Sequence, residues 1–107
     1  MDDQQAKPKP SYAPVYAAAL YPDLVAVARE HGYALAVHGS LQRDFDLIAV
    51  PWVESPSTHE QLLQAIEAAF ALRRIGKPAQ RPHGRIAHTF AVGFGACALD
   101  LQFFGGS

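Results

Sequence analysis

Two aspartates, Asp44 and Asp46, open an apolar run in the stretch HGSLQRDFDLIAVPW, which covers residues 38–52. Side chains alternate across a β-strand, so both carboxylates point to one face while Phe45 points to the other. Two neighbouring carboxylates repel each other unless one takes up a proton or a cation holds both. A divalent cation such as Mg²⁺, or Mn²⁺ in its place, binds carboxylate oxygens and completes its shell with water and phosphate. The pair therefore predicts a metal site.

A third carboxylate, Asp100, lies within the apolar run ALDLQFF at residues 98–104. A carboxylate in the middle of such a strand needs a partner. If this strand pairs beside residues 44–50, then Asp44, Asp46 and Asp100 converge on one patch. Three such carboxylates are the ligand set of a two-metal site for phosphoryl transfer, in which the metals bind the attacking and the leaving oxygens.

The order of these residues resembles the DNA-polymerase-beta-like nucleotidyltransferase superfamily. Gly39-Ser40 follows one strand, Asp44-Phe45-Asp46 enters the next, and Asp100 stands alone on a later strand. The resemblance covers roughly residues 17–104, and the sequence is also similar to small proteins of this kind from phages and prophages.

The resemblance implies a site and an activity. Gly39 and Ser40 are expected to contact nucleotide phosphates, and Asp44 and Asp46 to bind Mg²⁺ or Mn²⁺. Asp100 is expected to be the third metal ligand or the catalytic base for the acceptor hydroxyl. The implied reaction is transfer of a nucleotidyl group from a nucleoside triphosphate to an acceptor that the sequence does not identify.

Two departures from the family pattern favour an alternative. The spacer between Gly39-Ser40 and Asp44 is only Leu41-Gln42-Arg43, whereas the family usually has a longer one, and no extra domain for the acceptor is evident. The alternative is a non-catalytic module that keeps the fold and binds a nucleotide or a protein. A metal-dependent nuclease is a third hypothesis, which the lack of a lysine beside the aspartates weakens.

Cationic side chains that could meet phosphate cluster in one segment. Five of the nine lysines and arginines fall within residues 73–85, which the sequence predicts to be a basic loop. Such a loop facing an acidic metal patch would suit a triphosphate, and Arg85 is the favoured residue because its planar guanidinium matches phosphate. Arg43 is either a second phosphate contact or an ion-pair partner of the aspartates that makes a metal unnecessary. His38 is expected to be partly buried, with a structural or a site role.

The elements that must position these residues follow from the apolar pattern. A polar, proline-rich tail is expected at residues 1–14, then a helix over 15–32 that is broken at Tyr21-Pro22. Two short strands, 33–39 and 44–52, are close enough for an antiparallel hairpin. A second helix is predicted at about 58–74, and strands at 86–92 and 96–104 flank a GFGA turn. The prediction is one α+β domain over residues 15–107, with two main helices on a mainly antiparallel or mixed sheet of about four strands, a minimal nucleotidyltransferase-like fold.

Composition limits the class of protein. The chain has 107 residues, half of them hydrophobic, and a formal net charge of −1, so its overall charge does not favour nucleic acid or a membrane surface. A single cysteine, Cys97, excludes an internal disulfide and favours a reducing compartment. No apolar run approaches the roughly 20 residues of a membrane span, so the cytoplasm is the expected location. The aromatic pair Phe103-Phe104 near the end of the sheet would favour a homodimer if it is exposed.

Overall fold

The computed structural model describes residues 12–93 and 97–104. Its two helices are α1 (Ala13–Glu30) and α2 (His59–Phe70). A short 3₁₀ segment, Pro82–Gly84, joins two of the strands. The five strands are β1 (Tyr33–His38), β2 (Phe45–Pro51), β3 (Arg73–Arg81), β4 (Arg85–Val92) and β5 (Cys97–Phe104). The fold is therefore α+β with a five-stranded sheet, one strand more than the sequence predicts.

The sheet is mixed, with the order β1-β2-β5-β4-β3. The predicted hairpin of β1 and β2 is confirmed, with Tyr33 opposite Pro51 and His38 opposite Asp46. The meander β3-β4-β5 is also antiparallel, while β2 and β5 pair in parallel at the centre. The parallel pair brings together two segments that lie far apart in the sequence.

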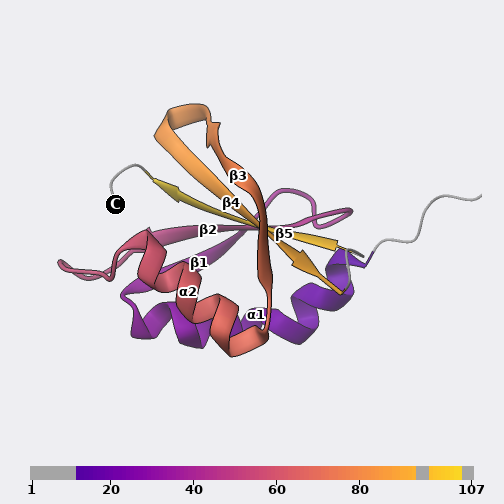
Figure 1. The fold of residues 1–107 in the computed structure, drawn as a ribbon, viewed down its shortest axis with the longest axis horizontal. Helices are drawn as coiled ribbons and strands as arrows, with labels where there is room; N and C mark the ends of the chain where they lie inside the picture. The colour runs from indigo at the N-terminus through magenta and orange to yellow at the C-terminus, as the bar shows by residue number, and fades with distance from the viewer. Residues whose placement is uncertain (1–11, 94–96, 105–107) are drawn as a thin grey trace, which may run out of the picture.

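Both helices cover the same face of the sheet (Figure 1). Strand residues that alternate toward this face are buried, as in Phe45, Leu47 and Ala49 of β2, while the residues between them are partly exposed. The opposite face, called the open face below, has no helix over it among the described residues. The hairpin of β3 and β4 rises on this open side (Figure 1). The largest fully buried side chains are Phe45, Phe90, Phe103, Leu24, Leu47, Leu62, Leu63, Ile66, Leu99 and Leu101.

Helix α1 is continuous, so the predicted break at Tyr21-Pro22 is wrong. Pro22 lies inside the helix, where its ring removes one backbone hydrogen bond. Buried residues on both sides of it, among them Ala13 and Leu24, hold the helix against the sheet, and such packing outweighs a local break. Ala13 and Pro14, which the sequence assigns to the tail, belong to α1, while residues 1–11 lie outside the described part.

The predicted basic loop after α2 is wrong, because residues 73–81 form the edge strand β3. In the sequence, Gly76 and Pro78 disfavour a strand prediction for this segment, because both residues are rare within strands. The pairing with β4 shifts register between Ile75 and Ala79, so the irregular part of β3 holds both residues. An edge strand tolerates a proline and a bulge because one side of its backbone needs no partner.

Helix α2 is shorter than predicted, since it ends at Phe70, with Ala71 in the left-handed region. Its start is as expected: Thr58 accepts from the Gln61 backbone N–H at 3.1 Å, and the Gln61 side chain accepts from the Thr58 N–H at 2.8 Å. This capping box satisfies two free backbone donors of the first turn.

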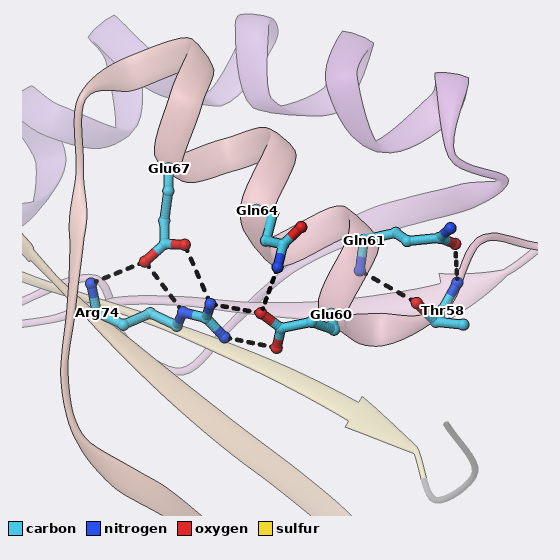
Figure 2. A network of polar contacts seen from close by, with 6 residues as sticks. All are labelled: Thr58, Glu60, Gln61, Gln64, Glu67 and Arg74. Carbon is cyan, nitrogen blue, oxygen red and sulfur yellow. Dashed lines mark hydrogen bonds and ion pairs between the residues drawn. The ribbon is translucent and has the colours of Figure 1, made fainter.

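An ion network joins α2 to β3 on the helix-covered face (Figure 2). Arg74 makes two hydrogen bonds to Glu60, at 2.7 and 2.8 Å, and its Nε lies 3.0 Å from Glu67 Oε2. These contacts hold the pKa of Glu60 down to about 2 and lower that of Glu67. The first half of β3 is therefore fixed to α2.

Candidate functional site

The structure brings Asp46 and Asp100 together at the centre of the sheet. They are direct partners in the parallel pairing of β2 and β5, and neighbouring strands lie about 4.8 Å apart. The residues beside each aspartate in its own strand, Phe45 and Leu47 or Leu99 and Leu101, are buried toward the helices. Both carboxylates therefore belong to the open face, as the alternation in the sequence predicts.

Asp46 and Asp100, called the acidic pair below, are in an environment that disfavours their ionised forms. Burial raises the pKa of Asp46, and the charges of Asp100 and Asp44 raise it further. Burial also raises the pKa of Asp100, although the Arg81 charge opposes the change. Asp100 Oδ1 is buried, and the described residues supply no hydrogen-bond donor to it. A buried, unpaired carboxylate oxygen needs a proton or a cation.

A second buried acceptor lies next to this oxygen along the strand. Gln102 is 4% exposed, and its Oε1 also has no hydrogen-bond partner. Asp100 and Gln102 are two residues apart in β5, so both belong to the open face. Two residues of one face of β5 thus each carry a buried oxygen atom for which the described residues supply no hydrogen-bond partner.

The turn after β1 fits closely against the acidic pair. Gly39 has φ +81°, and a Cβ built on it would lie 2.9 Å from Asp46 Oδ2. Only a glycine combines this backbone with such close approach to the carboxylate. The Ser40 hydroxyl accepts a hydrogen bond from the Gln42 backbone N–H at 3.3 Å and is at the surface. Gly39 is thus part of the site's wall, and Ser40 shapes the exposed turn.

Asp44 lies just before β2 and is exposed. Its charge raises the pKa of both Asp46 and Asp100. Even so, within residues 12–93 and 97–104 no three His, Cys, Asp or Glu side chains form a group that could hold a metal ion. The structure therefore assembles two of the three predicted carboxylates, and Asp44 as a metal ligand stays a prediction.

Two carboxylates still suit a magnesium ion that arrives with a nucleotide. Mg²⁺ is commonly bound through one or two carboxylates, with water and substrate phosphates as the other ligands. The Asp46 carboxylate is partly buried and the Asp100 side chain is 16% exposed, so each could supply an oxygen to such an ion. The donor set thus fits one divalent ion better than a closed two-metal cluster.

The cation joined to the acidic pair is Arg81. Its Nη2 lies 3.8 Å from Asp100 Oδ2, with the Arg81 side chain 40% exposed. Arg85, the residue favoured from the sequence, lies opposite Phe104, four residues along β5 from Asp100, and its Nε donates to the Pro82 carbonyl. Its predicted phosphate contact stays a prediction.

Arg43 is exposed and, within the described part of the chain, makes no ion pair with Asp44 or Asp46. The alternative in which Arg43 alone neutralises the aspartates therefore has no contact to support it. His38 lies opposite Asp46 in the β1–β2 pairing, and its charge lowers the pKa of Asp46. His38 is thus a neighbour of the site.

Arg81 and Gln102 are the site residues that the sequence analysis missed. Gln102 follows Asp100 on the same face of a predicted strand, so strand alternation could have found it. Arg81 had no comparable signal, because its position depends on β3, whose glycine and proline hide the strand.

The remaining histidines of the sheet and α2 pack around Phe103. The His59 ring stacks on Phe103 with a centroid separation of 4.0 Å, and His88 meets the same ring edge-on at 5.8 Å. Burial lowers the pKa of both histidines. This cluster lies on the helix-covered face and is structural. Phe104, by contrast, is 49% exposed, and the homodimer stays a prediction.

Comparisons with known proteins do not assign the chain to a family. No protein-family model matches the chain, and neither the curated proteins nor the solved structures include a significant match. Neither helix of the described residues has the length and apolar character to cross a membrane.

Proposed function

We propose that the protein binds a nucleoside triphosphate together with Mg²⁺ or Mn²⁺ on the open face of the sheet, as a nucleotidyltransferase-like protein. The observation that carries the proposal is the pairing of Asp46 with Asp100, whose buried Oδ1 has no donor. Asp46 and Asp100 would hold the ion, which when bound would neutralise phosphate charge and favour attack on phosphorus. Gly39, Ser40 and Arg81 lie around this position.

The proposed reaction is transfer of a nucleotidyl group to an acceptor hydroxyl. The acceptor oxygen would form a bond to the α-phosphorus while the bond from that phosphorus to the bridging oxygen breaks and pyrophosphate leaves. The hydroxyl proton would pass to a carboxylate, for which Asp100 is the candidate, as the lone aspartate of β5 beside Asp46. The acceptor is an unassigned hydroxyl compound.

The alternative is a binding module without turnover. It is favoured because the described residues hold no group of three metal-binding side chains. In this case nucleotide binding would persist, but no pyrophosphate would form. Measuring pyrophosphate release with all four nucleoside triphosphates distinguishes the two functions.

The first experiment is thermal unfolding with Mg²⁺ or Mn²⁺, each with and without the four nucleoside triphosphates. A ligand at 100 times its dissociation constant stabilises the fold by about 2.7 kcal/mol, which raises the Tm by several degrees. The rise should require metal and nucleotide together and should be lost in Asp46→Asn. Asp23→Asn, an exposed carboxylate on α1, is the matched control and should keep it. No rise in the natural protein, or an equal rise in Asp46→Asn, would refute the proposal.

A further inference from the structure

Arg81 reaches the acidic pair by a loose contact. The Arg81 Nη2 to Asp100 Oδ2 distance is 3.8 Å, whereas Arg74 approaches Glu60 to 2.7 Å and Glu67 to 3.0 Å. The Asp100 side chain is 16% exposed and the Arg81 side chain 40%. An ion pair of this length, with a solvated arginine, is weak. Arg81 is therefore easy to displace from Asp100.

Arg81 also leaves part of the carboxylate unsatisfied. It faces Oδ2, while Oδ1 is buried and lacks any donor. A cation bound to Asp100 would lower the carboxylate's attraction for the guanidinium, because two positive charges would then compete for one negative group. The guanidinium and a divalent ion are thus alternative partners of Asp100.

The strand that carries Arg81 allows the side chain to change partner. Arg81 is the last residue of β3, beyond the register shift between Ile75 and Ala79, at an edge of the sheet. The anchored part of β3, at Arg74, lies before this irregularity. Arg81 itself is paired with Arg85 of β4, so the backbone can stay in place while the solvated end of the Arg81 side chain, which is 40% exposed, turns away from Asp100.

We propose that Arg81 is the phosphate-binding residue of the site, resting on Asp100 in the free protein and moving to the phosphates when the metal–nucleotide complex binds. This inference rests on the proposed function and names the residue that selects for the phosphate chain. A guanidinium can bind phosphate oxygens bidentately, and such charge-assisted hydrogen bonds are stronger than a loose surface ion pair. Arg81 should therefore oppose binding of the metal alone and favour binding of the complex.

These opposite effects are measurable by calorimetric titration of the full chain. In Arg81→Gln, Mn²⁺ alone should bind severalfold more tightly, because a competing cation has been removed. ATP in saturating Mn²⁺ should bind at least about tenfold more weakly, the loss expected for a charge-assisted hydrogen bond. Arg81→Lys, which keeps the charge without the planar fork, should give an intermediate ATP affinity. Arg29→Gln, on the exposed surface of α1, is the control and should change neither value.

The outcomes separate this inference from the proposed function. If the natural protein binds neither Mn²⁺ alone nor Mn²⁺ together with any of the four nucleoside triphosphates, the proposed function and the role of Arg81 are both refuted. If it binds them and Arg81→Gln leaves nucleotide affinity unchanged, only the role of Arg81 is refuted. If Arg81→Gln weakens metal and nucleotide binding alike, while its Tm matches that of the natural protein, Arg81 supports the site structurally and the switch is refuted.

Discussion

Replacing Asp46 by asparagine should stabilise the metal-free protein at neutral pH. The substitution keeps the shape of the side chain and removes its repulsion with Asp100, its partner across the strands. At a separation of about 5 Å and an effective dielectric constant of about 20, two unit charges repel by about 3 kcal/mol. Partial exposure and salt screening reduce this to about 1–2 kcal/mol. The Arg81–Asp100 ion pair stays in place, and the loss of the smaller attraction of Asp46 to His38 and Arg81 offsets only part of this gain.

The pH dependence gives this prediction its sign. Because the folded-state pKa of Asp46 and Asp100 is raised above the ordinary value of 3.8, the folded protein binds more protons than the unfolded chain above that pH. Their contribution to stability therefore falls as the pH rises through the raised pKa values. Asp46→Asn should flatten this fall, and its advantage should disappear well below pH 3.8, where both carboxyls are protonated in either state.

The assay is urea or thermal unfolding at pH 7.5 in chelator and again at acid pH. A gain of 1 kcal/mol corresponds to a Tm increase of about 4–8 °C in a domain of this size. Asp100→Asn is the comparison and should gain less, because it also removes the partner of Arg81. If Asp46→Asn is less stable than the natural protein at pH 7.5 in chelator, the Asp46 carboxylate makes a favourable contact and the electrostatic argument is wrong.

Three further predictions concern the ion network, the turn and the partly buried His59. Arg74→Gln should destabilise the protein by about 1–2 kcal/mol in urea unfolding, since its bonds to two carboxylates are lost. Glu60→Gln should lower the free energy of unfolding by less, because Arg74 keeps Glu67 as a partner. Equal losses in the two variants would contradict this prediction. With the pKa of Glu60 lowered to about 2, this contribution is present above the ordinary pKa of 4.5 and should fade as the pH falls from there toward 2. Gly39→Ala should lower the free energy of unfolding by about 1–2 kcal/mol, because Gly39 has a positive φ and a Cβ there would lie close to Asp46. The affinity for nucleotide should fall as well. An unchanged Tm would mean that the turn adjusts to the extra methyl group without strain. The pKa of His59 is lowered, so its contribution to stability should fall as the pH drops below 6.5. Because the pKa of His88 is lowered as well, the Tm difference between pH 7 and pH 5 should become smaller in His59→Phe without vanishing, and an unchanged difference would contradict the assignment.

The sequence predicts most of this fold because its apolar alternation is strong where the sheet is central. The strand LIAV of β2 and the strand around Asp100 are buried on the helix side, and both were predicted at nearly the right bounds. The failures lie where tertiary packing outweighs a local signal. Pro22 stays inside α1, and Gly76 and Pro78 are accommodated in an edge strand by a register shift.

The acidic pair was predictable for the same reason, whereas its cationic partner was not. Asp46 and Asp100 follow from alternation within each strand, once the two strands are assumed to be neighbours. The register that places them directly opposite each other needs the structure. Arg81 belongs to β3, the strand that Gly76 and Pro78 conceal in the sequence, whereas the sequence favours Arg85. Local patterns thus locate a buried charge more readily than the long side chain that reaches it.

The parallel pair of β2 and β5 also divides the molecule into two locally folding halves. The first half holds α1 and the β1–β2 hairpin, and the second half, after α2, holds the β3-β4-β5 meander. Within each half, every strand pairs only with a strand that is next to it in the sequence. The seam between the halves closes a loop of more than fifty residues, from Phe45–Ala49 to Leu99–Phe103. One aspartate of the pair comes from each side of this seam. The strand pairing of longest range, of a kind that is slow to form, is thus the one that brings two like charges together. Any cation that binds both aspartates also joins the two halves to each other.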